Sequence, residues 1–207
     1  LDFDGTDDYV NIPHDAALDF AADEDFAVTA WVKIPSAAQP LAGSTTNHDI
    51  VSKWDGGAPG YPYALRYRNT SKKLLAYRYD GTNSPQVDST STLDDDTFHH
   101  VALVKDGKTL RMYVDGVEED TTTDTTTAAN GTNNTDSVRI GKRETGNTRN
   151  IQAVIDDVRI YDHALSLSEI GVLSGTSTVP EPSTFAGLLL VSIAGLFRHR
   201  RRRCSVG

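Results

Sequence analysis

The chain has 207 residues, with 20 basic and 29 acidic side chains and a formal net charge of −9 at pH 7. This length is sufficient for one domain with a full hydrophobic core. An acidic surface repels nucleic acid and anionic membranes, so the composition argues against a nucleic-acid-binding protein. The one cysteine, Cys204, lies close to the C-terminus, so the main part of the chain cannot contain an internal disulfide. We therefore expect a domain that is stabilised by its core, with or without a bound metal.

Apolar and polar residues alternate with a period of two along most of the chain before residue 175, which is the pattern of β-strands. The expected strands are Tyr9–Ile12, Phe26–Ile34, Ile50–Trp54, Tyr63–Arg68, Leu74–Tyr79, Phe98–Lys105, Leu110–Val114, Val138–Lys142 and Ile151–Tyr161. Asp-Gly turns separate several of them, and Asp106-Gly107 marks the clearest hairpin. Residues 119–136, rich in Thr, Asn and Asp, are expected to form a long solvated loop. Ser166 and Glu169 have the spacing of a capping box, which predicts one short helix over 166–173.

Several of these strands have distinctive sequences. They include Leu1-Asp2-Phe3-Asp4-Gly5, Val28-Thr29-Ala30-Trp31-Val32-Lys33, Tyr113-Val114-Asp115-Gly116 and Ile155-Asp156-Asp157-Val158-Arg159-Ile160-Tyr161. In this order, and over residues 1–174, they resemble a LamG-like domain, which is a concanavalin A-like jelly roll. The resemblance implies an all-β sandwich of two antiparallel sheets, with the first and last strands as neighbours. Phe98 stands where the family usually has Trp, and we expect it to remain an aromatic core residue.

The last 28 residues combine three signals in a fixed order. Pro180, Glu181 and Pro182 interrupt regular structure, residues 184–197 are uncharged and mostly apolar, and residues 198–203 are rich in arginine. An apolar span followed by arginines suits a membrane helix with its basic end in the cytoplasm. The span is short, because ~14 residues at ~1.5 Å per residue cover about 21 Å of a hydrocarbon layer of ~30 Å.

This order of signals resembles the PEP-CTERM sorting signal of Gram-negative bacteria. The resemblance implies that an exosortase-type enzyme cleaves near Pro180, Glu181 and Pro182, and that the protein reaches the cell surface or the extracellular matrix. We therefore divide the chain into a domain over 1–174, a linker over 175–179 and a sorting signal over 180–203. Before processing, residues 184–197 would hold the protein in the membrane; the alternative is a permanent C-terminal membrane anchor. Because the chain starts at Leu1 and already has a strand pattern there, we expect a fragment or a processed form.

A structural calcium ion is the metal that the sequence favours. In several relatives of this architecture, one calcium ion connects the first strand to the last, and the position of Asp156 matches that of its carboxylate ligand. Strict alternation would place Asp156 on the same face as Val158 and Ile160, where an unpaired carboxylate is unfavourable. Asp4 lies in the first turn and could supply a second oxygen ligand, since calcium prefers six to eight of them. The alternative is that Asp156 accepts hydrogen bonds from backbone amides.

Candidate ligand-binding residues come from three of the expected strands. Trp31 lies on the face opposite to the core residues Phe26 and Val28. On neighbouring strands, alternation groups tyrosines on one side, Tyr67 and Tyr77 among them, and arginines on the other, Arg66 and Arg78 among them. Aromatic rings beside guanidinium groups suit sugars, which offer an apolar face and many hydrogen-bonding hydroxyls. A buried aromatic layer inside the sandwich explains the aromatic residues without a ligand, and an ordinary solvated sheet face explains the arginines better than a site does.

Glycan-cleaving enzymes need two carboxylates that flank the scissile bond. In the laminarinase-like branch of this architecture they lie on one strand as Glu-x-Asp-x(x)-Glu, and this spacing does not occur in the sequence. We therefore predict an exported, non-catalytic binding or adhesion module for glycans or an exopolysaccharide matrix. A divergent glycan hydrolase or lyase, or a purely structural matrix protein, remains as the alternative.

Overall fold

The structure of the protein is a computed structural model that describes residues 1–37, 46–54, 60–127, 132–143 and 149–177. The three predicted signals at the C-terminus, including Pro180, Glu181, Pro182 and the apolar span 184–197, lie outside the described residues. Within those ranges the helices are η1 (Ala16–Leu18) and α1 (Leu167–Leu173). None of the described helices has the length and apolar character needed to cross a bilayer.

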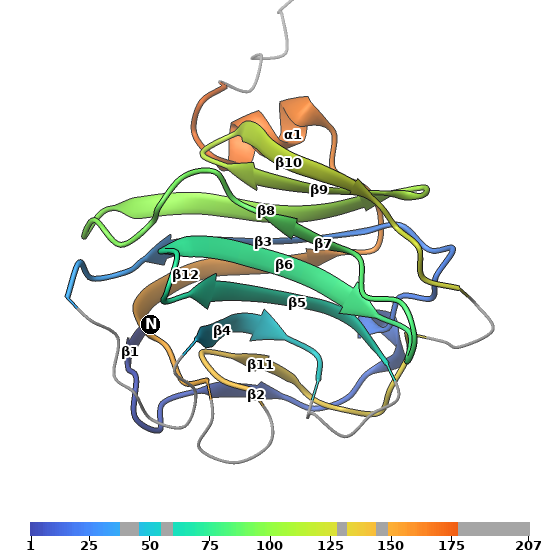
Figure 1. The fold of residues 1–207 in the computed structure, drawn as a ribbon, viewed down its shortest axis with the longest axis horizontal. Helices are drawn as coiled ribbons and strands as arrows, with labels where there is room; N and C mark the ends of the chain where they lie inside the picture. Colours follow the sequence, from blue (N-terminus) through green and yellow to red (C-terminus); the bar gives the residue numbers. More distant parts are fainter. Residues whose placement is uncertain (38–45, 55–59, 128–131, 144–148, 178–207) are drawn as a thin grey trace, which may run out of the picture.

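The described strands form two six-stranded sheets, and all of their pairings are antiparallel (Figure 1). Sheet A has the order β1 (Asp2–Asp4), β12 (Gln152–Tyr161), β3 (Phe26–Lys33), β8 (Phe98–Asp106), β9 (Thr109–Val114) and β10 (Val117–Thr123). Sheet B has the order β2 (Val10–Ile12), β11 (Val138–Ile140), β4 (Asn47–Ser52), β5 (Tyr61–Arg68), β6 (Lys73–Tyr79) and β7 (Gln86–Asp88). The predicted two-sheet sandwich is confirmed, and so is the pairing of the first strand with the last.

The core lies between the two sheets, because each strand turns alternate side chains inward. On β3, Phe26, Val28 and Val32 point into this core and are completely buried. The ring of Phe26 stacks on Phe20 at 5.0 Å and lies 5.8 Å from Tyr63 of sheet B, so aromatic contacts join the layers. Burying each such side chain contributes roughly 1.5–3 kcal/mol, which makes this layer the main source of stability.

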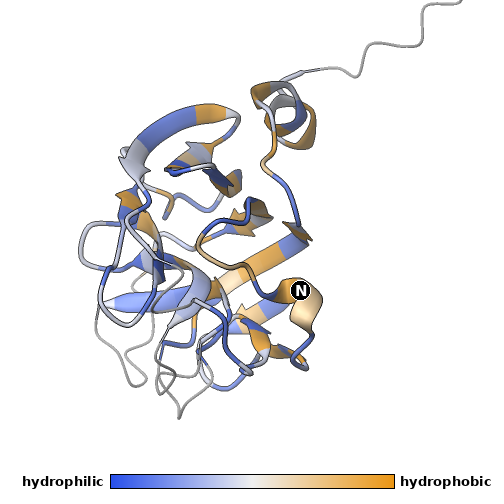
Figure 2. Ribbon diagram, turned by 90° about the vertical axis from the view of Figure 1, so that its right-hand side faces the viewer, coloured by the Kyte–Doolittle hydropathy of each residue, from blue (hydrophilic) through white to orange (hydrophobic). Residues whose placement is uncertain are grey.

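A smaller core lies on the outer face of sheet A, where α1 packs (Figures 1 and 2). Ala102 and Tyr113 of the sheet are buried there against Leu165 and Ile170. The predicted capping box is present: Ser166 accepts a hydrogen bond from the Glu169 amide, and the Glu169 carboxylate accepts one from the Ser166 amide at 2.8 Å. The helix prediction is thus confirmed.

Two expectations about local structure are wrong. The first part of the expected loop 119–136 continues strand β10, which pairs with β9 although its side chains are polar. An edge strand needs backbone hydrogen bonds but not apolar residues on both faces. The polar composition of this segment was therefore not sufficient reason to predict a loop. Phe98 is 45% exposed rather than in the core, because it opens β8 opposite Lys33, whose ammonium lies 5.4 Å from its ring.

Candidate functional site

Aromatic and charged side chains gather on the outer face of sheet B. The ring of Trp54, just after β4, lies 4.7 Å from that of Tyr61, and Tyr61 meets Tyr77 edge-on at 5.3 Å. The Arg66 guanidinium contacts two of these rings, 4.4 Å from the centre of the Tyr77 ring and 5.2 Å from that of the Trp54 ring. We call Asp49, Trp54, Tyr61, Arg66, Tyr77 and Arg149 the Trp54 cluster.

The register between β5 and β6 explains why these residues meet. Ala64 is opposite Tyr77, and Leu65 is opposite Ala76, so from Ala64 onward even-numbered residues of β5 share a face with odd-numbered residues of β6. A register shift before Ala64 brings Tyr61 to the same face, opposite Tyr79. Leu65 and Ala76 are in the core, which leaves Arg66 and Tyr77 together on the outer face. The expected separation of tyrosines from arginines is therefore wrong, because it assumed the same parity on both strands.

A buried ion pair forms the base of the Trp54 cluster. Arg66 Nε lies 2.7 Å from Asp49 Oδ1, and both side chains are almost completely buried. Arg149 Nη1 lies 3.9 Å from the same oxygen and its side chain is 19% exposed. Burial lowers the pKa of the Arg66 guanidinium, the nearby Asp49 carboxylate opposes this shift, and the charge of Arg149 adds to it.

Several polar atoms of this ion pair have unused hydrogen-bonding capacity. Among the described residues, Arg66 Nη2, Arg149 Nη1 and Asp49 Oδ2 are buried without a hydrogen-bond partner. Such atoms are costly to leave unsatisfied, which makes the cluster able to accept a polar group from a ligand or from water. A further cation, the Arg143 guanidinium, lies 4.8 Å from the Trp54 ring.

Two of the five predicted ligand-binding residues are on the core side of sheet B. Tyr67 is completely buried within the main core. Arg78 is completely buried as well, with Nη1 2.9 Å from Asp124 Oδ2 and Nη2 donating to the carbonyl of Phe20 at 2.9 Å and to Thr132 Oγ1 at 3.0 Å. These contacts give Arg78 the role of joining loops at one end of the sandwich.

Trp31, another of the predicted ligand-binding residues, lies on sheet A. It is partly exposed on the outer face of sheet A, where its ring contacts that of His100 edge-on at 5.5 Å. Burial lowers the pKa of His100, which favours its neutral form beside the indole. Of the predicted set, the structure brings together only Arg66 and Tyr77.

The two predicted calcium ligands do not come together. Asp4 of β1 is opposite Gln152 of β12. Asp156 lies four residues further along β12 and is opposite Trp31 of β3. Asp156 is exposed and accepts a hydrogen bond from the amide of Asp157, and a register shift between 156 and 159 separates it from the face of Ile160. The expected shared face is therefore wrong, because a β-bulge changes the parity of the strand.

Asp4 instead belongs to an exposed acidic turn. Carboxylate oxygens of Asp4, Asp7 and Asp8 lie within 4.8 Å of one another. Two of them already accept backbone hydrogen bonds: Asp4 from Thr6 at 2.7 Å, and Asp8 from Asp4 at 3.1 Å. Three exposed carboxylates suit calcium chemically but supply only part of its usual six to eight oxygens, so calcium binding stays a prediction.

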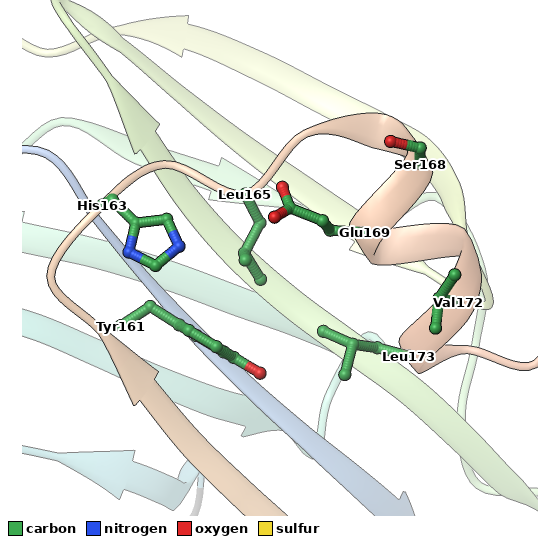
Figure 3. Close-up of a pocket in the computed structure, with 7 residues that line it drawn as sticks. All are labelled: Tyr161, His163, Leu165, Ser168, Glu169, Val172 and Leu173. Atoms are coloured by element: carbon green, nitrogen blue, oxygen red, sulfur yellow. The ribbon is translucent and has the colours of Figure 1, made fainter. Parts of the chain in front are cut away.

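A second candidate is a cavity of about 420 Å³ between α1 and the outer face of sheet A (Figure 3). It is lined by Tyr161, His163, Leu165, Ser168, Glu169, Val172 and Leu173. Figure 3 shows the side chains of Val172 and Leu173 coming from α1, that of Leu165 from the loop before the helix, and the ring of Tyr161 below Leu165. Glu169 is engaged in the capping box and His163 contacts Asp162 at 3.0 Å, so the cavity mainly offers apolar surface.

Sequence reasoning missed Asp49, Trp54, Tyr61 and Arg149. Asp49 directly precedes the core residue Ile50, so alternation turns its side chain to the outer face of sheet B, but alternation gives no signal that a cation would be buried with it there. For Trp54 and Tyr61 the signal was weaker, since each lies at a strand end where alternation no longer fixes the face. Arg149 follows no strand pattern, and only the folded chain brings it to Asp49.

The comparisons with known proteins agree with this architecture. A family model described as the concanavalin A-like lectin/glucanases superfamily matches residues 4–171. No curated protein matches the sequence. The binding domain of Paraclostridial Mosquitocidal Protein 1 superposes with a TM-score of 0.66 at 16% identity, over 84% of this chain and 42% of that chain.

Two further structures share the fold. Domains LG4-5 of the mouse laminin alpha1 chain give a TM-score of 0.60 at 16% identity, over 80% of this chain and 42% of that chain. The binding domain of botulinum neurotoxin serotype D gives a TM-score of 0.61 at 15% identity, over 84% of this chain and 41% of that chain. The chain thus spans about two-fifths of each of these structures. Since the family model covers most of the sequence, this chain belongs to the concanavalin A-like lectin/glucanases superfamily.

Proposed function

We propose that this protein is an exported binding module that holds a glycan on the outer face of sheet B without cleaving it. The observation that supports this most directly is the Trp54 cluster, in which the rings of Trp54 and Tyr77 contact the guanidinium of the Arg66–Asp49 pair and Tyr61 contacts both rings. Aromatic rings bind the apolar face of a sugar, and guanidinium and carboxylate groups bind its hydroxyls. Two of the structures with the same fold are themselves binding domains, which agrees with this role.

Trp54 provides the test of this proposal. Replacing it with Ala should lower the affinity for the best ligand of a glycan array by at least about tenfold, measured by calorimetry, because the stacking surface is lost. Trp31→Ala removes a comparable ring from the opposite sheet and should leave the affinity unchanged. A loss of binding in Trp31→Ala and not in Trp54→Ala would move the site to sheet A, and the absence of any glycan ligand would contradict the proposal.

The absence of catalysis is part of the proposal. Asp49 is buried and paired with Arg66, a state that suits a structural carboxylate better than an acid or a nucleophile. Incubation with bound oligosaccharides should therefore produce no new reducing ends and no unsaturated products. Either product would support the alternative of a glycan hydrolase or lyase, whereas a purely structural matrix protein would give neither product nor binding.

We also propose that the C-terminal residues direct export and sorting. The support is the order of Pro180, Glu181 and Pro182, the apolar residues 184–197 and the arginines of 198–203. In a host with an exosortase-type system, the full chain should reach the cell surface or the extracellular matrix in a shortened form. A variant with Ala at residues 180–182 should stay unprocessed in the membrane fraction, and unchanged processing of that variant would contradict this assignment.

A further inference from the structure

We infer that the Trp54 cluster selects glycans that carry carboxylates, such as chains of uronic acids, over neutral glycans of the same length. This inference rests on the proposed glycan-binding role of the same face and specifies the class of glycan. The charge of the cluster, its unused hydrogen-bond donors and the position of Arg149 support this preference.

The charge of the cluster is unbalanced. Two guanidinium groups, those of Arg66 and Arg149, share the single carboxylate of Asp49. Asp49 and Arg66 are almost fully removed from water, so their surroundings screen the second positive charge only weakly. This local excess of positive charge occurs on a chain whose formal net charge is −9, which makes the cluster attractive to anions relative to the rest of the surface.

The unused hydrogen-bonding groups of the Trp54 cluster include donors of both arginines and one acceptor, Asp49 Oδ2. Within the described parts of the chain, Arg66 Nη2 and Arg149 Nη1 lack an acceptor. A carboxylate matches the paired N–H groups of a guanidinium better than a hydroxyl does, because it accepts two parallel hydrogen bonds. Both guanidinium groups lie within 5.9 Å of the Trp54 ring. A sugar stacked on Trp54 would thus place a carboxylate substituent next to these donors.

Arg149 is the accessible member of the pair. Its side chain is 19% exposed, compared with 1% for Arg66. Its backbone has a φ of 68°, in the left-handed region that Asn or Gly adopts more readily, and its carbonyl accepts a hydrogen bond from the Asp49 amide at 2.9 Å. An arginine at a position whose backbone disfavours it is consistent with a use for its side chain.

The left-handed backbone at Arg149 allows a substitution that removes the charge without straining the fold. Arg149→Asn removes the cation and tolerates this conformation better than arginine does, so the domain should fold with an unchanged or higher melting temperature. Arg149→Lys retains the charge without the planar guanidinium. Arg159→Gln is the matched control, because Arg159 is an exposed arginine of sheet A that pairs with Asp157 at 2.8 Å.

The experiment measures the affinity of the full chain for three oligosaccharides of equal length: a glucuronate oligomer, a neutral glucose oligomer and a sulfated oligomer. The glucuronate oligomer should bind at least about tenfold more tightly than the neutral one. Arg149→Asn should bring the ratio of the two affinities close to one, Arg149→Lys should reduce the preference partly, and Arg159→Gln should retain it. Raising NaCl from about 50 mM to about 500 mM should weaken binding of the acidic oligomer selectively.

The possible outcomes separate this inference from the function on which it rests. Equal binding of acidic and neutral oligomers, or a preference that survives in Arg149→Asn, would overturn the inference and leave glycan binding intact. Tighter binding of the sulfated than of the carboxylated oligomer would overturn the choice of carboxylate. If none of the oligomers and no glycan of the array binds, the proposed function itself fails.

Discussion

Two buried arginines differ from the surface arginines in what their partners contribute. Arg66 and Arg78 each contact an aspartate at less than 3 Å in the interior, Asp49 and Asp124 respectively. By contrast, Arg68 and Asp88 pair at 2.9 Å where both side chains are about one-third exposed. Water and salt compensate for the loss of an exposed partner but not for the loss of a buried one.

Asp124→Ala tests this difference. It leaves the Arg78 guanidinium buried without its counter-charge and should lower the free energy of unfolding by about 3–5 kcal/mol in urea titrations. Asp88→Ala breaks the exposed pair and should cost less than about 1 kcal/mol. Equal decreases in the free energy of unfolding in the two variants would show that burial does not determine how much these ion pairs contribute to stability.

His99 is the residue for which we predict the clearest pH dependence. Burial lowers the pKa of His99, but hydrogen bonds to Asp115 at 2.7 Å and to Asp95 at 3.2 Å outweigh this and raise it overall above 6.5. Because the folded pKa exceeds the unfolded one, His99 stabilises the fold fully below pH 6.5, and this contribution disappears as the pH rises through the folded pKa.

Proton NMR titration of the histidines measures this directly. The midpoint of His99 should lie above 6.5, and Asp115→Asn should lower it. His48 and His100 should titrate below 6.5, because burial lowers the pKa of each. The pH dependence of their contributions to stability is therefore opposite to that of His99: the contributions of His48 and His100 are lost as the pH falls. A midpoint of His99 at or below 6.5 would contradict its pairing with the two aspartates.

At the scale of elements, the strands could be predicted because one face of each strand is buried, so apolar and polar residues alternate along the sequence. The sequence did not predict which side chains of two neighbouring strands point to the same face of the sheet. The pairing of Ala64 with Tyr77 sets the parity between β5 and β6, and this depends on how the turn between them closes. In β12, the register shift after Asp156 reverses the parity within one strand, and Asp157 adopts a φ of 46° there. Because the parity between β5 and β6 was not known, Arg66 and Tyr77 were expected on opposite faces. The other four of the six residues of the Trp54 cluster were absent from the predicted site, because they lie at strand ends, outside a strand pattern or without a sequence signal for a buried partner.

Phe3 of β1 lies close to Gly141, and a substitution at this glycine tests how much this close packing contributes to stability. Gly141 follows β11 with a φ of 87°, and a Cβ at this position would lie 2.4 Å from the ring of Phe3 on β1. Gly141→Ala should therefore destabilise the protein by about 2–5 kcal/mol, from backbone strain and from overpacking against Phe3.

Gly107 provides the control for this substitution. It also has a positive φ, of 55°, but a Cβ there would meet no atom within 4 Å. Gly107→Ala should cost only the backbone strain, about 1–2 kcal/mol, in the same urea titrations. If the two substitutions cost the same, the close approach of Phe3 to Gly141 does not contribute to stability.

At the scale of the whole molecule, residues 4–10 connect sheet A to sheet B. Asp4 ends β1 in one sheet and Val10 begins β2 in the other, and the acidic turn lies between them. We predict that calcium bound by Asp4, Asp7 and Asp8 would stabilise this crossover. Calcium should raise the melting temperature relative to a chelator, and Asp8→Asn should remove the increase. Identical melting curves with calcium and with chelator would contradict the prediction.

The positions of α1 and the Trp54 cluster on opposite outer faces have a consequence for how the molecule would sit on a cell. The chain leaves α1 through Thr176 and Ser177, whose amides donate hydrogen bonds to the Gly171 carbonyl beside sheet A. If residues beyond this point attach the protein to an envelope, its attachment end and its aromatic platform point in opposite directions. A tethered molecule would then present sheet B outward, toward the surrounding polymer.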